Sequence, residues 1–302
     1  MVNLSTTIGS LHLKNPTMLA SGIMDEDAGS MQRMIDCDAG AIVTKSIGMQ
    51  PRKGYPNPTV LELEFGLLNA MGLPNPGVDE YGNEMKQLHK SKIPIIGSIY
   101  AANVPDFIAL ASKMKQYGAA AVELNVSCPH AKRYGLEVGC DTSLLQMIVS
   151  SIKKQVRIPV FVKVSPNVVN IVEIAMAAEK GNADAIVAIN TVKGMKIDLE
   201  IAQPILANKT GGYSGKAIKP IGVRCVYDIA QNVKIPVIGV GGITTGDDAI
   251  EYFMAGASAV QIGSAVYYRG PDVFKSVCNE ISVWMDNHGY KKITELVGAA
   301  FQ

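Results

Sequence analysis

Eight short apolar runs recur along the chain, and each is followed by a segment with helical periodicity. Their apolar character is continuous rather than alternating, which is typical of parallel strands covered by helices on both faces. Eight strand–helix units in succession predict an α/β fold of the closed (βα)8 type, the TIM barrel; an open doubly wound sheet is the alternative. The predicted strands are residues 16–22, 39–47, 93–100, 119–127, 158–165, 183–191, 235–242 and 257–265.

The segments between these runs carry residues that begin and end helices. Residues 104–118 end in Gly118, which suits a helix C-cap. Residues 141–155 begin with Asp141 or Thr142 as the candidate N-cap. Both segments are therefore predicted to be helices.

Three connections are longer than a simple loop between a strand and a helix. They span residues 48–78, 128–141 and 192–215. Loops of that length usually carry function, because a scaffold gains nothing from them. We expect them to lie over the C-terminal face of the barrel, where the active site of this fold is built.

Length and composition fit one large domain. The chain has 302 residues, of which 48% are hydrophobic, and a barrel of this kind needs ~250, so we expect a single domain over residues 1–302. The 28 basic and 27 acidic residues are mixed, so nucleic acid and anionic membranes are not expected partners. No secretion signal and no run of ~18 apolar residues is present, which predicts a cytoplasmic protein with a small-molecule ligand.

The five cysteines do not form a recognisable framework. They are widely spaced, odd in number and without a CxxC pair, so neither a metal site nor a dithiol is predicted. We expect the thiols to be reduced and mostly structural.

Polar residues end most of the predicted strands. Because the active site of a βα barrel lies at the C-terminal strand ends, these side chains are expected to converge on one mouth. They are Ser21, Lys45, Ser46, Ser98, Asn125, Ser127, Cys128, Lys163, Ser165, Asn190, Thr191, Gly241, Gly242, Gly263 and Ser264.

The last two of these loops suggest a phosphate site. Residues 239–249 read GVGGITTGDDA and residues 261–266 read QIGSAV. Glycines let the backbone approach an anion closely, and N–H groups at the start of a short helix can bind it. The alternative is that the glycines only make tight turns.

Lysines and asparagines point to the remaining ligand chemistry. Lys45 and Lys163 each interrupt an apolar strand, where a lysine is costly to bury without an anionic partner; a solvated edge lysine is the alternative. Asn69, Asn125 and Asn190 offer donors and acceptors suited to a planar ligand with N–H and C=O groups, although each alone is more often a turn or cap.

Cys128 is the sharpest candidate for chemistry. It follows the fourth strand in NVSCPH, where Pro129 directs the chain out of the strand. No Ser–His–Asp or Cys–His–Asn set is evident, although His130 lies two residues away. The thiol is either a general base for a carbon acid or an inert buried residue.

Several motifs together resemble class 1 dihydroorotate dehydrogenases, and the resemblance runs in order along the whole chain. NAMGLPN together with NVSCP is highly specific, whereas GVGGI is shared with many phosphate-binding barrels. The motifs are SIGM (46–49), NAMGLPNPG (69–77), NVSCP (125–129), VKVSPN (162–167), INT (189–191), ANKTGGYSG (207–215) and GVGGI (239–243).

The resemblance implies an FMN-dependent oxidoreductase of de novo pyrimidine (UMP) biosynthesis that oxidises dihydroorotate to orotate. Cys128 would take the proton from C5 while the C6 hydride passes to N5 of the flavin, and Lys163 would stabilise the charge of the reduced ring. Lys45 and Lys163 join Cys128 as catalytic residues. One FMN per chain would contact Ser21, Lys45, Ser46, Ser98, Asn125, Lys163, Ile189, Gly215, Gly241, Gly242, Gly263 and Ser264. Substrate would contact Lys45, Asn69, Ala70, Met71, Gly72, Leu73, Asn125, Asn190 and Thr191.

The resemblance also bears on partners. Residues 211–231 look more like the class 1B type, which pairs with an iron–sulfur flavoprotein subunit carrying FAD and passes electrons to NAD. A homodimer or a heterotetramer with that subunit is expected, and the fumarate-using class 1A homodimer is one alternative. Others are a flavin barrel acting on another dihydropyrimidine and a non-catalytic phosphate-binding barrel.

Two positions depart from the family's pattern. His130 stands where an asparagine is common in the family, and Ser98 stands where family members often have asparagine.

Overall fold

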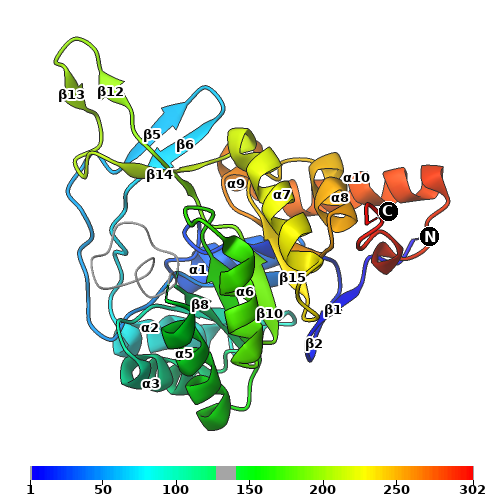
Figure 1. Cartoon of the computed structure of the whole chain (residues 1–302), viewed down its shortest axis with the longest axis horizontal. Coiled ribbons are helices and arrows are strands. Elements are labelled where there is room, and N and C mark those ends of the chain that lie inside the picture. The colour runs from blue at the N-terminus through cyan, green and yellow to red at the C-terminus, as the bar shows by residue number, and fades with distance from the viewer. Residues whose placement is uncertain (1, 127–140, 302) are drawn as a thin grey trace.

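The computed structural model describes residues 2–126 and 141–301, and its centre is a closed barrel of parallel strands (Figure 1). The strand order around the ring is β10-β15-β16-β3-β4-β7-β8-β9. Every barrel strand falls within one of the eight predicted runs, so the (βα)8 fold is confirmed and the open sheet is excluded. The strands are β3 (Thr17–Leu19), β4 (Ala41–Val43), β7 (Ile95–Ile99), β8 (Ala121–Asn125), β9 (Val160–Val164), β10 (Ala185–Ala188), β15 (Val237–Val240) and β16 (Ala257–Ile262).

Helices cover the outside of the barrel. Both predicted helices are confirmed, and the side chain of Asp141 caps the second by accepting from the Leu144 amide at 2.9 Å. Among the described residues, none of the helices is both long and apolar enough to cross a membrane. They are α1 (Ala28–Asp36), α2 (Val78–Gln87), α3 (Val104–Gln116), α5 (Thr142–Gln155), α6 (Ile171–Lys180), α7 (Lys219–Ala230), α8 (Gly246–Met254), α9 (Ala265–Arg269) and α10 (Val273–His288), with 3-10 turns at η1 (Lys216–Ile218) and η2 (Ile293–Glu295).

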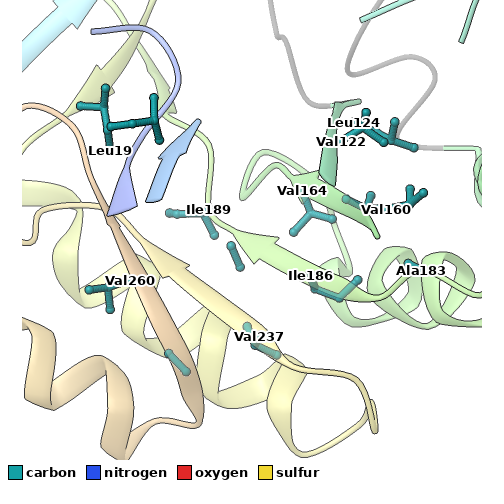
Figure 2. Close-up of a cluster of buried hydrophobic side chains, with 14 of the residues drawn as sticks. Leu19, Val122, Leu124, Val160, Val164, Ala183, Ile186, Ile189, Val237 and Val260 are labelled. Carbon is teal, nitrogen blue, oxygen red and sulfur yellow. The ribbon is translucent and has the colours of Figure 1, made fainter. Parts of the chain in front are cut away.

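The core has an outer and an inner layer, because successive side chains of a strand point to opposite faces. The outer layer lies between strands and helices and includes Val122, Val160 and Val260 (Figure 2). The inner layer fills the barrel itself and includes Phe161 and Ala259, each one position along from an outer residue. The continuous apolar runs are thereby explained, since both faces of each strand are buried.

A hairpin that the sequence pattern did not predict joins the inner core. β1 (Thr6–Ile8) and β2 (Leu11–Leu13) are antiparallel, and Ile8 and Leu13 pack against inner-layer residues such as Met18 and Phe161. Three-residue strands are too short for an alternation to stand out. The hairpin thus seals the end of the barrel opposite the strand carboxyl ends.

Two of the long connections meet in one small antiparallel sheet beside the mouth (Figure 1). Residues 48–78 supply β5 (Val60–Leu63) and β6 (Gly66–Asn69). Residues 192–215 supply β11 (Val192–Gly194) and β14 (Gly211–Ser214), and also an outlying pair, β12 (Ile197–Asp198) and β13 (Gln203–Pro204). The sheet order β11-β14-β6-β5 holds these two connections together.

The buried end of the hairpin gives a stability prediction. Leu13→Ala leaves a cavity under the barrel and should lower the free energy of unfolding by roughly 2–5 kcal/mol, measured by urea denaturation. His12→Ala is the matched control, because His12 is the exposed neighbour on the same strand. Equal effects of the two substitutions would contradict a sealing role for the hairpin.

Candidate functional site

A cavity of about 460 Å³ opens at the carboxyl ends of the barrel strands, and this volume lies in the usual range for small-molecule sites. Residues from several strands and from the connections 48–78 and 192–215 line it, as the sequence predicted for this fold. The predicted site residues along its wall are Ser21, Lys45, Ser46, Asn69, Met71, Gly72, Leu73, Asn125, Lys163, Ile189, Asn190, Thr191, Gly215, Gly241, Gly242, Gly263 and Ser264.

Three predicted residues that the structure describes do not line this wall. Ser165 is buried, and its Oγ accepts from the Asn167 amide at 3.1 Å. Ser98 is fully buried beneath the wall, and its hydroxyl lies 2.8 Å from that of Ser46. Ala70 is buried in the small sheet's own core with Leu68, so its side chain points away from the cavity. Cys128 lies outside the described residues, as do Ser127 and His130.

Ser46 is the centre of a hydroxyl and amide network at one side of the cavity. Its Oγ accepts a hydrogen bond from Asn125 Nδ2 at 3.0 Å and lies 3.4 Å from the Ser21 hydroxyl. Ser98 supports it from below. The network fixes the Asn125 amide, so this side of the cavity presents preset polar groups to a ligand.

The two predicted lysines have different surroundings. The Lys45 ammonium pairs with Glu26 Oε1 at 2.9 Å, and Glu26 is largely exposed at the cavity wall. Lys163 is only 6% exposed, donates to Gln261 Oε1 at 3.3 Å and lies 3.7 Å from Glu123. Each lysine has an acidic partner, so the alternative that they are solvated lysines at a strand edge is excluded for both.

Hydrogen bonds from side chains hold the backbone of residues 69–75, from which Asn69, Met71, Gly72 and Leu73 line the cavity. Arg52 Nε donates to the Gly72 carbonyl at 2.7 Å. Buried Asn75 donates to the Leu73 carbonyl at 2.9 Å and accepts from the Gly77 amide at 2.9 Å. Side-chain bonds to the backbone therefore fix the segment that presents Asn69 to the cavity.

Two backbone segments approach each other closely at the glycine-rich end of the cavity. A Cβ on Gly242 would lie 2.8 Å from the Gly215 carbonyl oxygen, and the Gly242 φ of +71° also favours glycine. Gly241, Gly263 and Ser264 line the same end. Glycines on the wall have no side chain to cover their backbone N–H groups, and this arrangement suits a phosphate group.

The described part of the chain has no group of three or more His, Cys, Asp or Glu side chains arranged to hold a metal ion. Its cysteines, Cys37, Cys225 and Cys278, are free thiols. Burial raises the pKa of Cys225 and raises that of Cys278 to about 11, so these two thiols stay protonated at neutral pH.

The residues that line or support the cavity without having been predicted include Glu26, Glu123, Gln261 and Tyr267. Glu123 and Gln261 interrupt apolar strands just as the two lysines do, so the same rule could have identified them. Glu26 lies in the loop before α1 and Tyr267 lies within the short helix α9; both reach the cavity only in the folded chain, and no local signal marks them.

Buried Asp25 lies behind the loop that carries Ser21 and Gly22. It is fully buried, and its Oδ2 accepts from the Gly22 amide at 2.5 Å, whereas Oδ1 has no hydrogen-bond partner within residues 2–126 and 141–301. Burial raises the pKa of this carboxyl to about 6, against the opposing effects of the Gly22 bond and the Lys45 charge. The Asp25 carboxylate thus fixes the loop at Gly22, and the free-energy cost of burying its charge depends on pH.

Comparison with known proteins gives a consistent family. A family model described as dihydroorotate dehydrogenase matches residues 3–285. The chain is 50% identical to a protein of Thermoplasma acidophilum over 302 residues, which is 100% of both chains. It is 51% identical to one of Methanocaldococcus jannaschii, covering 99% of this chain and 98% of the relative. It is 48% identical to one of Pyrococcus abyssi, covering 99% of each. All three relatives are named dihydroorotate dehydrogenase B (NAD(+)), catalytic subunit.

Asp25→Asn should change the dependence of stability on pH. The folded-state pKa of about 6 lies above the unfolded value of ~3.9, so ionisation costs the wild type stability as pH rises from about 4 through 6. The free energy of unfolding of the wild type should fall relative to the variant by roughly 2–3 kcal/mol over that range. Urea titrations at each pH measure this, with exposed Asp36→Asn as the control. A difference that does not vary with pH would contradict the assignment.

Proposed function

Because the chain belongs to the dihydroorotate dehydrogenase family, we propose that it oxidises dihydroorotate to orotate in pyrimidine biosynthesis, with FMN bound in the mouth of the barrel. One observation supports this most: Lys45, Asn69, Asn125 and Lys163 line one cavity that ends in a glycine-rich wall. An anionic substrate, a planar ring and a phosphate each find suitable residues there.

The described residues fit FMN at two ends. Gly241, Gly242 and Gly263 line the end of the cavity where the phosphate would bind, with no side chain over their backbone N–H groups. Lys163 and the fixed amide of Asn125 would hold the ring. FMN, when bound, supplies the acceptor for a hydride. The chain's own residues position the reactants and stabilise charge.

Lys45 would hold the carboxylate of the substrate. In the structure it pairs with the exposed Glu26, and a substrate carboxylate could replace that partner at little cost because Glu26 is free to return to water. Asn69, Asn125 and Asn190 would bind the N–H and C=O groups of the ring.

Cys128 is the proposed base for the C5 proton. It follows Asn125, the last residue of β8, by three positions in NVSCP. A thiol is a competent general base once ionised, and the reductive rate should rise toward alkaline pH. Its proton acceptance and the loss of the C6 hydride together remove two hydrogens and two electrons from the substrate.

The electron acceptor is proposed to be NAD, reached through a separate subunit. The relatives' names include NAD(+) and call them catalytic subunits, which supports a second polypeptide. That subunit would carry FAD and an iron–sulfur cluster, and a homodimer of this chain with two copies of it would give a heterotetramer in the cytoplasm.

Anaerobic mixing with dihydroorotate tests the function. The flavin absorbance of the wild-type holoprotein should bleach rapidly, whereas Cys128→Ala should bind FMN normally and bleach at least ~100-fold more slowly, because general bases contribute that much. Cys225→Ala is the control thiol. A holoprotein that dihydroorotate does not bleach would overturn the proposed activity. A wild-type rate in Cys128→Ala would overturn the assigned base alone.

Lys45→Ala tests the substrate class. The loss of its ammonium should lower kcat/KM for dihydroorotate far more than for dihydrouracil, which has no carboxylate, by about 1.5–3 kcal/mol in transition-state free energy. Steady-state kinetics with both substrates measure the difference. Equal losses would favour another dihydropyrimidine as the natural substrate.

A further inference from the structure

A closed set of polar side chains crosses the interior of the barrel directly beneath the cavity. Glu123 of β8, Lys163 of β9 and Gln261 of β16 share the inward register of their strands. Two positions earlier on the same strands, the inward residues are the apolar Ala121, Phe161 and Ala259. A polar layer therefore lies between the apolar inner core and the cavity.

The contacts within this layer span the barrel. Gln261 Nε2 donates to Glu123 Oε2 at 2.6 Å, although β16 and β8 lie on opposite sides of the ring. Lys163 Nζ donates to Gln261 Oε1 at 3.3 Å and lies 3.7 Å from Glu123 Oε1. Glu123 Oε1 has no hydrogen-bond partner among the described residues, so the ion pair is what compensates this atom.

Glu123 determines how two groups face Lys163: its own carboxylate and the side-chain amide of Gln261. Its carboxylate supplies the ion pair directly, and it also fixes the Gln261 amide, because an acceptor opposite Nε2 leaves Oε1 to face the lysine. Lys163 and Gln261 line the cavity, whereas Glu123 does not. The positive end of the pair is therefore the end nearer a ligand.

We propose that Glu123 is a positioning residue that holds the Lys163 ammonium in place and directed at the flavin, so that the site favours the reduced over the oxidised cofactor. This inference rests on the proposed FMN site. An ammonium that is 6% exposed is costly to hold there without a counter-charge. Glu123 supplies that counter-charge and Gln261 supplies a hydrogen-bond acceptor, so the ammonium is held in place when the ring becomes negative.

Glu123→Gln tests the role with little change in shape. The new amide supplies no charge and no longer requires Gln261 to present Nε2, so Lys163 loses its counter-charge and the fixed orientation of its acceptor. The reduction potential of bound FMN, measured by dye-linked titration, should fall. This corresponds to a loss of about tenfold or more in affinity for reduced FMN relative to oxidised FMN. An unchanged or raised potential would overturn the proposal, because Glu123 would then only offset the lysine's charge.

A double-mutant cycle separates this role from simple packing. In a Lys163→Met background, Glu123→Gln should leave the potential unchanged or raise it, since there is no ammonium to hold and a lone carboxylate is removed. A fall of the same size in both backgrounds would show a structural effect and overturn the proposal.

Gln261→Met keeps the test decisive if Glu123→Gln does not fold. It removes the bridging amide and leaves both charges, so the potential should fall by less than in Glu123→Gln but in the same direction. A potential equal to that of the wild type would overturn the proposal. If the wild-type protein does not bind FMN at all, the proposed function fails instead, and the two failures are distinct.

Discussion

Closure of the barrel is the constraint on which the rest of this structure depends. Once the eight strands form a ring, every second side chain of each strand must fill an interior that excludes water. Ala121, Phe161 and Ala259 meet that demand with apolar volume. Polar side chains are tolerated one layer higher only as mutual partners, as Glu123 and Lys163 are.

The same constraint explains why the site is preset. Side chains at the strand ends are held by a close-packed ring, so their hydrogen bonds form before a ligand arrives. Ser46 fixes Asn125 in this way, and Gln261 links Lys163 to the opposite wall. A ligand therefore meets charges and amides whose orientation has already been set, which is the condition for electrostatic catalysis.

The small sheet beside the mouth solves a different problem, since long loops are costly to order. β6 and β14 belong to connections far apart in the chain, yet they pair with Asn69 opposite Gly212. Asn69 Nδ2 also donates to the Gly212 carbonyl at 3.3 Å. Pairing between the two loops thus places Asn69 and Thr191 on the wall of the same cavity.

The sequence by itself determined the eight strands and most of the residues at their carboxyl ends, because period and polarity are local properties of a buried parallel strand. It also marked Lys45 and Lys163 as charges placed in apolar runs, where each needs an anionic partner. Only the tertiary structure decided their partners, since Glu26 and Glu123 reach them from other elements. It likewise decided that Ala70 faces a separate core and that two distant loops share one sheet, because such pairings depend on register across the fold rather than on neighbours in the chain.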